Sequence, residues 1–358
     1  MGNKKLKFAI VGCGRITRRH SELLGNKQIA GAALVAVCDI IPAKAKKTGE
    51  QFQVSYYTDA YEMLEKEEID VISICTESGH HAENVIQLAK FGKHIVVEKP
   101  MALTLDDADL MIKACDENNI KLFVVKQNRF NVPVQKLRQA VEENRFGRFV
   151  LGTVRVRWCR TQEYYNMEPW RGTWAMDGGV LANQASHHID LLEWMLGDVE
   201  SVFAKSMTAL VNIEAEDTAI VVLKFKNGAL GIIEATTATR PKDLEGSISL
   251  LGEKGSVEIG GFAVNEMKAW NFTNKTREDE FVLKEYSVNP PSVYGFGHQA
   301  YYEHVVDCIL NDKKQLVDGL EGRKSLELIS AIYESIETGK EVFLRFKPDK
   351  CKLGHKNE

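Results

Sequence analysis

Short, continuously apolar runs alternate with amphipathic stretches through the first 126 residues, and no other feature of the sequence limits the possible folds as strongly. The apolar runs cover residues 8–11, 34–37, 71–74, 95–97 and 122–125. Runs without polar alternation are typical of parallel strands that are covered on both faces. Between two of them, residues 104–119 combine a capping threonine with a single apolar stripe, as a helix does. We therefore predict an α/β fold with a doubly wound parallel sheet of the Rossmann type.

After Gly147 the sequence changes to a series of strand-like runs. They cover residues 149–160, 219–225, 230–235, 248–251 and 257–259. Helical patterns follow Asn131 and cover roughly residues 180–196, 298–310 and 320–336. A chain of 358 residues has room for about two domains. We predict a dinucleotide-binding domain over residues 1–126. Residues 127–358 should form an α+β domain for substrate binding and oligomerisation, with a large, mostly antiparallel sheet and some helices that pack back on the first domain.

The bulk properties exclude several classes of partner. A net charge of -4 gives no field that would gather nucleic acid or an anionic membrane, so we expect neither. No apolar stretch approaches the ~18 residues that span a bilayer. The seven cysteines are scattered without a CxxC pair, as is typical of reduced, buried thiols. The paired histidines at residues 80–81 and 187–188 lack metal-ligand spacing, and we predict no metal. We expect a cytoplasmic protein.

A glycine-rich motif follows the first predicted strand. The segment Gly12-Cys13-Gly14-Arg15-Ile16-Thr17 reads G-x-G-x-x-G with threonine in the third position. Gly12 allows the tight turn, and Gly14 lets the backbone approach a pyrophosphate at the N-terminus of the next helix. Thr17 should cost little, because the third glycine serves mainly in helix packing. By itself the motif is equally consistent with a plain glycine turn, and its place after the first strand favours nucleotide binding.

The second predicted strand ends at Asp39, which lies 25 residues beyond Gly14. This is near the ~20-residue spacing at which an acidic side chain binds the hydroxyls of the adenosine ribose. A carboxylate there would repel the 2′-phosphate of NADP, and no arginine follows within residues 40–44. The alternative is a solvated aspartate in the turn before Pro42. We predict NAD in preference to NADP.

The strand at residues 95–97 is followed by Glu98-Lys99-Pro100. The carboxyl ends of strands face the ligand crevice in a doubly wound sheet, which would direct Lys99 toward a cofactor. A lysine beside a positively charged nicotinamide has a lowered pKa and can relay a proton near neutral pH. An exposed lysine in a turn is the alternative interpretation.

Two further candidates come from positions that share a face. On a helix over residues 180–196, Asn183 and His187 are i,i+4 neighbours, which makes His187 the functional histidine. His188 shares its face with apolar residues and is interpreted as structural. Strand alternation over residues 154–160 places Arg160 on the same face as Trp158. If that face is buried, Arg160 needs an anionic partner from the protein or from the substrate.

Together these residues resemble the glucose–fructose oxidoreductase / inositol dehydrogenase / MocA family over nearly the whole chain. The resemblance is carried by residues 12–16, Thr76 with His81, and residues 98–100, 178–190 and 331–335. It implies NAD as cofactor, with Lys99 and His187 as the catalytic residues. Glu77 and Ser78 depart from the usual proline and asparagine, and Asn183 stands where the family frequently has aspartate. The glycine motif and the resemblance together imply the following cofactor-binding residues: Gly12, Gly14, Arg15, Ile16, Asp39, Thr76, Ser78, His81, Glu98, Lys99, Gln127, Trp170 and Arg171.

Within the family, five segments are most similar to bacterial dehydrogenases of UDP-N-acetylglucosaminuronate, which act in the biosynthesis of surface polysaccharide such as lipopolysaccharide O-antigen. These segments are residues 126–131, 160–165, 169–174, 183–187 and 294–298. The similarity implies NAD-dependent oxidation of the sugar C3 hydroxyl by a homodimer or homotetramer. Trp170 and Arg171 would then lie against the cofactor of the same or a neighbouring subunit. The implied contacts to the UDP-sugar are Lys99, Arg160, Tyr164, Asn183 and His187.

Two other functions remain open at this point. One is a different sugar or polyol dehydrogenase of the same fold, such as one that acts on inositol. The other is a non-catalytic sensor that binds NAD. The presence of both Lys99 and His187 argues against a sensor, which needs no proton relay. No self-contained uridine motif separates the two dehydrogenase alternatives.

Overall fold

The computed structural model describes residues 5–287, 297–344 and 351–355. The chain forms two compact units, one of Met1–Lys126 with His298–Arg323 and the other of Gln127–Gly297 with Lys324–Glu358. The first unit thus includes a segment from near the end of the chain. Of the segments named above, residues 294–296 fall outside the described part of the chain. Within the described residues, no helix is both long enough and apolar enough to span a membrane.

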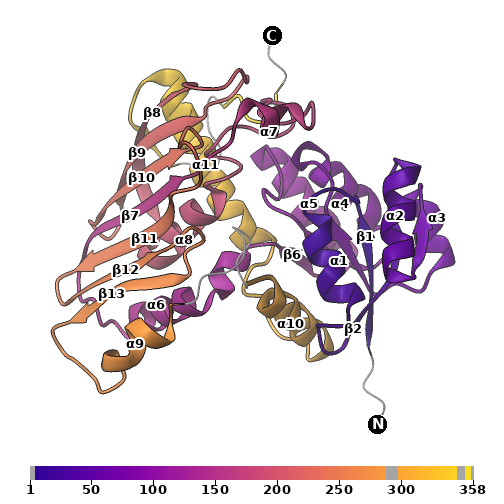
Figure 1. Cartoon of the computed structure of the whole chain (residues 1–358), viewed down its shortest axis with the longest axis horizontal. Helices are drawn as coiled ribbons and strands as arrows, with labels where there is room; N and C mark the ends of the chain where they lie inside the picture. Colours follow the sequence, from indigo (N-terminus) through magenta and orange to yellow (C-terminus); the bar gives the residue numbers. More distant parts are fainter. Residues whose placement is uncertain (1–4, 288–296, 345–350, 356–358) are drawn as a thin grey trace. The chain divides into compact units, whose positions relative to one another are not determined.

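The first unit is built on a six-stranded parallel sheet with the order β3-β2-β1-β4-β5-β6. Figure 1 labels β1, β2 and β6 of this sheet. Its strands are β1 (Leu6–Val11), β2 (Ala32–Cys38), β3 (Ser55–Tyr57), β4 (Val71–Ile74), β5 (His94–Val97) and β6 (Leu122–Val124). The strand order reverses between β1 and β4, the point at which doubly wound sheets bind ligands. The predicted fold class is confirmed. Only β3 was not anticipated, because its Ser-Tyr-Tyr sequence is short and largely exposed at the sheet edge.

Helices follow the strands of the first unit in the expected alternation. They are α1 (Thr17–Gly25), α2 (Pro42–Phe52), α3 (Ala60–Lys66), η1 (Ser78–His80), α4 (His81–Ala89), α5 (Leu105–Glu117) and, from His298 onward, α10 (Gly297–Leu310). The side chain of Thr104 caps α5 by accepting a hydrogen bond from the Asp107 amide at 3.1 Å, as predicted. The predicted stripe of α5 is buried at Leu105, Ala108, Met111 and Cys115.

The second unit contains an eight-stranded sheet with the order β13-β12-β11-β7-β10-β9-β8-β14. Its strands are β7 (Phe149–Arg157), β8 (Val199–Met207), β9 (Thr218–Phe225), β10 (Leu230–Thr236), β11 (Glu245–Gly252), β12 (Gly255–Gly260), β13 (Glu266–Phe272) and β14 (Val342–Phe343). Neighbouring strands are antiparallel except β7 and β10, which are parallel, so the sheet is mixed. The strands β8, β13 and β14 were not predicted. The sequences of β8 and β13 contain polar residues between the apolar ones, so neither forms a continuous apolar run.

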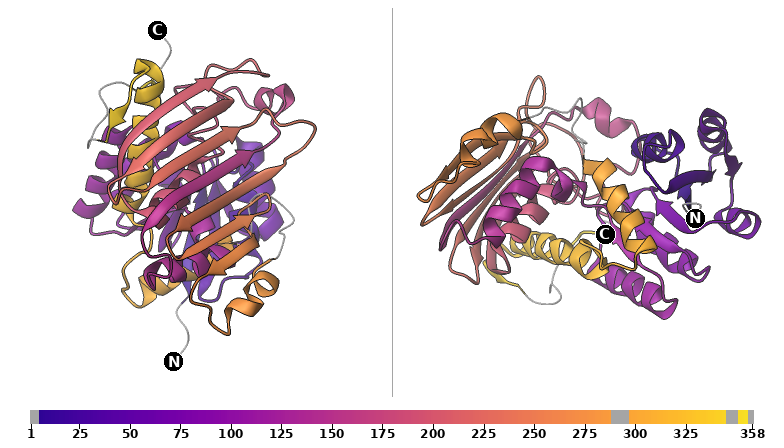
Figure 2. Two further views of the ribbon diagram at one scale, coloured as in Figure 1. Left: turned by 90° about the vertical axis from the view of Figure 1, so that its left-hand side faces the viewer. Right: turned by 90° about the horizontal axis from the view of Figure 1, so that it is seen from below.

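Helices pack on one face of this sheet and leave the other face exposed (Figure 2). The helices of the unit are η2 (Gln127–Phe130), α6 (Val132–Glu142), α7 (Gln162–Asn166), α8 (Ser186–Leu196), α9 (Asp279–Glu285) and the part of α11 (Gly319–Thr338) that begins at Lys324. Helix α8 packs on β7 and β11, and α6 packs on β12. The opposite face of the sheet presents apolar side chains to solvent, among them Ile220 and Val222.

Candidate active site

The glycine turn after β1 has the geometry that a dinucleotide site requires. Gly12 has a φ of +93°, and a Cβ added there would lie 2.7 Å from the backbone of Cys75 and Thr76, so only glycine fits. A Cβ added at Gly14 would meet nothing within 4 Å, which leaves room for a ligand to approach. No side chain caps the N-terminus of α1, which starts just beyond the exposed Arg15. The free N–H groups of that helix end can therefore receive a pyrophosphate.

Thr17, in the place of the third glycine, folds its side chain back onto the turn. It is buried, and its hydroxyl donates a hydrogen bond to the Gly12 carbonyl at 2.5 Å. The larger residue therefore adds a bond that holds the turn instead of entering the space beside Gly14.

Asp39, directly after β2, links the two loops at this end of the sheet. One carboxylate oxygen accepts a hydrogen bond from the Cys13 amide at 2.7 Å, and the other accepts one from the Ile41 amide at 2.8 Å. Asp39 is therefore not merely a solvated residue of the turn before Pro42. Its contact with the cofactor ribose stays a prediction.

His81, at the start of α4, holds the loops that follow β4 and β5. Its Nδ1 lies 2.7 Å from the Pro100 carbonyl oxygen, and its Nε2 lies 3.1 Å from the Thr76 carbonyl oxygen. Burial lowers the pKa of His81. Both ring nitrogens thus face protein carbonyls, and the cofactor contact of His81 stays a prediction. Ser78, in the neighbouring turn η1, is also buried.

Lys99 follows β5 and is half-buried. Its amide donates a hydrogen bond to the Glu98 carboxylate at 3.0 Å, and the Lys99–Pro100 peptide bond is cis. Glu98 itself is buried, and its other oxygen accepts a hydrogen bond from His20 at 2.8 Å. The predicted contact of Glu98 with the cofactor stays a prediction, and it would involve the backbone of Glu98. Its carboxylate is turned into the protein, because two histidines from distant segments approach it there.

In the second unit, His187 lies in the first turn of α8 and is buried. Its Nε2 is 2.9 Å from the side-chain amide nitrogen of Gln127, the first residue of η2. The structure thus brings together two of the predicted site residues. His188 is fully buried with its ring 5.9 Å from the Trp158 ring, and burial lowers its pKa to about 4. It lies in the core, as its predicted helix face requires.

The helix that carries His187 begins later than predicted. It starts at Ser186, so Asn183 lies in the preceding turns, and the argument that Asn183 and His187 share a helical face is wrong. The reason is a distant residue, Glu216. Its backbone carbonyl accepts from the Val180 amide and its carboxylate accepts from the Leu181 amide, both at 2.9 Å. These bonds hold the segment in turns. Burial raises the pKa of Glu216 to about 7.

Asn183 is paired with an aspartate that the sequence analysis did not single out. Its side-chain amide donates to Asp177 at 2.5 Å, and the other oxygen of Asp177 accepts from the Gly172 amide at 2.9 Å. Asp177 is buried. A carboxylate is thus present beside the residue that replaces the frequent aspartate of the family. Asp177 could have been singled out from the sequence, because it directly precedes the glycine pair at residues 178–179.

Four more predicted residues gather in the second unit. Arg171 donates to the Tyr164 hydroxyl at 2.5 Å, and its guanidinium lies over the Tyr164 and Trp170 rings at 4.4 and 4.8 Å. The Arg160 guanidinium lies 5.4 Å from the Tyr164 ring. It also donates to Asp243 at 2.9 Å, which supplies the anionic partner that its burial requires. The protein therefore already neutralises Arg160 in part.

Comparison with known proteins identifies the family. Residues 6–126 match the NAD-binding Rossmann fold of an oxidoreductase family, and residues 138–344 match the C-terminal alpha/beta domain of the same family. The chain belongs to the Gfo/Idh/MocA oxidoreductases. Its cofactor is NAD, in agreement with the prediction, and the glycine turn and Asp39 lie within the matched NAD-binding domain.

Two solved structures are similar to this chain over almost its full length. The WlbA dehydrogenase from Bordetella pertussis, in complex with NADH and UDP-GlcNAcA, is 42% identical with a TM-score of 0.92 over 96% of this chain and 99% of that one. The WlbA dehydrogenase from Chromobacterium violaceum, in the same kind of complex, is 43% identical with a TM-score of 0.89 over 96% and 97%. A more distant relative, the myo-inositol 2-dehydrogenase of Thermotoga maritima, is 29% identical over 95% of this chain and 98% of its own.

Replacing Asp39 by alanine should narrow the preference for NAD over NADP, because it removes the charge that repels a 2′-phosphate. NAD affinity should also fall, since the carboxylate holds the Cys13 amide of the glycine turn. Titration of both cofactors measures the two effects. Asp39→Asn is the matched control, because it removes the charge and keeps an acceptor for Cys13. Equal affinity of the unaltered protein for NAD and NADP would contradict the assignment of Asp39.

Proposed function

We propose that this protein is an NAD-dependent dehydrogenase of UDP-N-acetylglucosaminuronate, which oxidises the C3 hydroxyl of the sugar to a ketone during surface-polysaccharide biosynthesis. The observation that carries the proposal is the 42–43% identity, over 96% of the chain, to two dehydrogenases whose structures contain NADH and UDP-GlcNAcA. The alternative is oxidation of a polyol or free sugar. It is supported by the myo-inositol and D-apiose dehydrogenases, which are 29% and 26% identical.

Proton transfer is assigned to Lys99 and His187, and bound NAD supplies the hydride acceptor. A general base must present an unprotonated nitrogen to the hydroxyl that it deprotonates. The contact of 2.9 Å between Gln127 and His187 Nε2 determines which ring nitrogen that is. The side-chain amide nitrogen of Gln127 can only donate, so Nε2 has the lone pair and Nδ1 carries the hydrogen. We propose this arrangement, with Nε2 as the proton acceptor.

The sugar is assigned to the second unit, where Arg160, Tyr164 and Asn183 are the proposed contacts. Arginine binds a carboxylate through paired donors, so Arg160 is the candidate partner of the uronate. One of its terminal nitrogens is held by Asp243 at 2.9 Å. Asp243 thus orients the guanidinium but also lowers the positive charge that a uronate would meet.

The protein should therefore turn over UDP-N-acetylglucosaminuronate and act only weakly on UDP-N-acetylglucosamine, which lacks the carboxylate that the paired donors of Arg160 would bind. NADH formation on these two nucleotides and on myo-inositol measures the preference. Assays should include 2-oxoglutarate, in case the reduced cofactor stays bound. Arg160→Lys should weaken the discrimination, since lysine keeps the charge but not the paired donors.

Asp243→Asn is the matched variant for this assay. It retains a hydrogen-bond acceptor beside Arg160 and removes the competing negative charge, so the KM for the uronate should fall. Turnover of myo-inositol alone would establish the alternative function. Equal rates on both nucleotides would keep the sugar-nucleotide assignment and remove Arg160 as the carboxylate partner.

We also propose that the protein forms a homodimer or homotetramer through the open face of its eight-stranded sheet. In register across β8, β9 and β10, the side chains of Phe203, Val222 and Ile232 form an exposed apolar row. Beside it Arg157 pairs with Glu234 at 2.6 Å and with Glu245 at 3.2 Å. An apolar patch bordered by such charges is typical of a protein–protein interface.

A further inference from the structure

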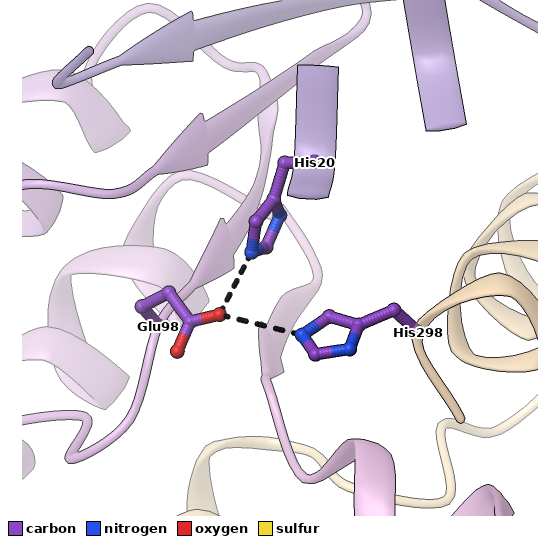
Figure 3. Close-up of side chains that lie close together, drawn as sticks. All are labelled: His20, Glu98 and His298. Atoms are coloured by element: carbon purple, nitrogen blue, oxygen red, sulfur yellow. Dashed lines mark hydrogen bonds and ion pairs between the residues drawn. The ribbon is translucent and has the colours of Figure 1, made fainter. Parts of the chain in front are cut away.

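The first unit contains a buried cluster of two histidines and a carboxylate, His20, His298 and Glu98 (Figure 3). Glu98 directly precedes Lys99 in the sequence. His20 comes from α1, Glu98 follows β5, and His298 begins the part of α10 in this unit. One oxygen of Glu98 is 2.8 Å from His20 Nε2 and 4.0 Å from His298 Nε2. On its other side, His20 Nδ1 is 2.6 Å from the Tyr302 hydroxyl. The proposed function makes no use of His20, His298 or Tyr302.

These residue types bind metals, but the distances are those of a hydrogen-bonded ion pair. Two ligand atoms that each lie about 2.0–2.1 Å from a tetrahedral zinc are about 3.3 Å apart. The Glu98–His20 distance of 2.8 Å is too short for this and the Glu98–His298 distance of 4.0 Å is too long. The geometry therefore points to a proton between Glu98 and His20.

The charges of the cluster agree with this interpretation. Burial by itself lowers the pKa of His20, but the neighbouring Cys75 and Tyr302 and the hydrogen bond to Glu98 raise it well above its ordinary value. Burial raises the pKa of Glu98, but His20, His298 and Lys99 lower it to about 2. Both directions favour an imidazolium beside a carboxylate. The titratable groups that surround this pair are Cys75, His81, Lys99, His298, Tyr301 and Tyr302.

The pair is joined directly to Lys99. While one oxygen of Glu98 faces His20, the other accepts a hydrogen bond from the Lys99 amide at 3.0 Å. The charge of Lys99 also acts on the Glu98 carboxylate. A buried carboxylate needs a compensating cation, and without His20 the groups left to supply it are His298, at 4.0 Å, and Lys99.

We propose that His20 is a positioning residue for Lys99, which it serves by neutralising Glu98. The imidazolium satisfies the carboxylate, so that Glu98 does not compete for the Lys99 amine. This inference rests on the proposed function, which gives Lys99 a part in proton transfer.

A double-mutant cycle over the two residues tests the proposal. His20→Gln removes the cation nearest to the Glu98 carboxylate, and should lower kcat about tenfold with less than a threefold change in the KM of the sugar nucleotide. In the double variant His20→Gln/Glu98→Gln, two amides can keep the hydrogen bond without any charge. Its kcat should return to within about threefold of the unaltered protein. A merely structural role predicts that the two losses add.

The reactivity of Lys99 provides a readout that needs no substrate. The protein with saturating NAD is treated with a small amine-reactive ester at fixed pH, and peptide mass spectrometry gives the labelling rate of Lys99 relative to the other lysines. His20→Gln should slow labelling of Lys99 at least threefold, because an ammonium ion does not react. Glu98→Gln alone, and the double variant, should label as fast as the unaltered protein or faster.

Leu24→Ala is the matched control for lost packing, because Leu24 is a fully buried residue of the same helix. It should lower thermal stability and leave both kcat and Lys99 labelling within twofold.

Slow labelling of Lys99 in Glu98→Gln would overturn the proposal, and so would additive losses in the cycle. Stoichiometric zinc in the purified protein would also overturn it, in favour of a metal site. If no sugar nucleotide or polyol is oxidised, the proposed function fails, and the labelling experiment still decides the role of His20.

Discussion

Replacing Lys99 by methionine or His187 by alanine should lower kcat by a factor of about 100 or more, the usual scale for a group that transfers a proton during catalysis. Lys99 stands at the end of β5, and His187 lies in the first turn of α8 with Gln127 at its Nε2. Steady-state NADH formation on UDP-N-acetylglucosaminuronate measures the effect. NAD affinity should survive the histidine change, because the glycine turn belongs to the other unit.

His188→Ala is the control for the histidine variant, since it changes the adjacent residue. The His188 ring is fully buried beside Trp158, and burial lowers its pKa to about 4, so it is neutral at physiological pH. Its loss should leave a cavity and lower the unfolding temperature, while the folded fraction keeps its kcat. The assignment of the two histidines would be reversed if His188 proved essential to turnover and His187 dispensable.

Replacing Arg129 by alanine should lower the free energy of unfolding by about 3–5 kcal/mol, because it leaves the Asp190 carboxylate buried without its partner. The pair has two hydrogen bonds, at 2.8 and 2.9 Å, and its side chains are 4% and 2% exposed. The guanidinium also lies 4.8 Å from the Trp194 ring. Denaturant titration measures the loss. A loss of less than about 1 kcal/mol in the free energy of unfolding would show that the pair contributes little to stability despite its burial.

The same pair should affect catalysis, because it ties the two segments that hold His187. Arg129 lies in η2 with Gln127, and Asp190 lies one helical turn beyond His187 in α8. Asp190→Asn should therefore lower the kcat of the folded protein as well as its stability. Arg145→Ala is the matched control, since it breaks another two-bond pair, with Asp279 on α9. It should reduce stability and leave kcat unchanged.

Local patterns were sufficient to predict the parts of this protein whose residues are neighbours in sequence. Strands β1, β2, β4, β5 and β6 are visible as apolar runs, because a parallel strand covered on both faces needs apolar side chains on both. The glycine turn could also be predicted from a local motif, although what excludes a side chain at Gly12 includes the backbone of Cys75 and Thr76. Strands β8 and β13 were not predicted because polar residues interrupt their apolar sequences, and β3 was not predicted because it has only three residues.

What only the tertiary structure decided are the partners of the polar side chains. Asn183 was expected on a helix, but Glu216, distant in the sequence, holds its segment in turns. The need of Arg160 for an anion could be predicted from strand alternation, whereas Asp243 as that anion could not. The pairing of His20 with Glu98 joins positions 78 residues apart. A buried charge must find its counter-charge wherever the folded chain brings one near, and that position has no regular spacing in the sequence.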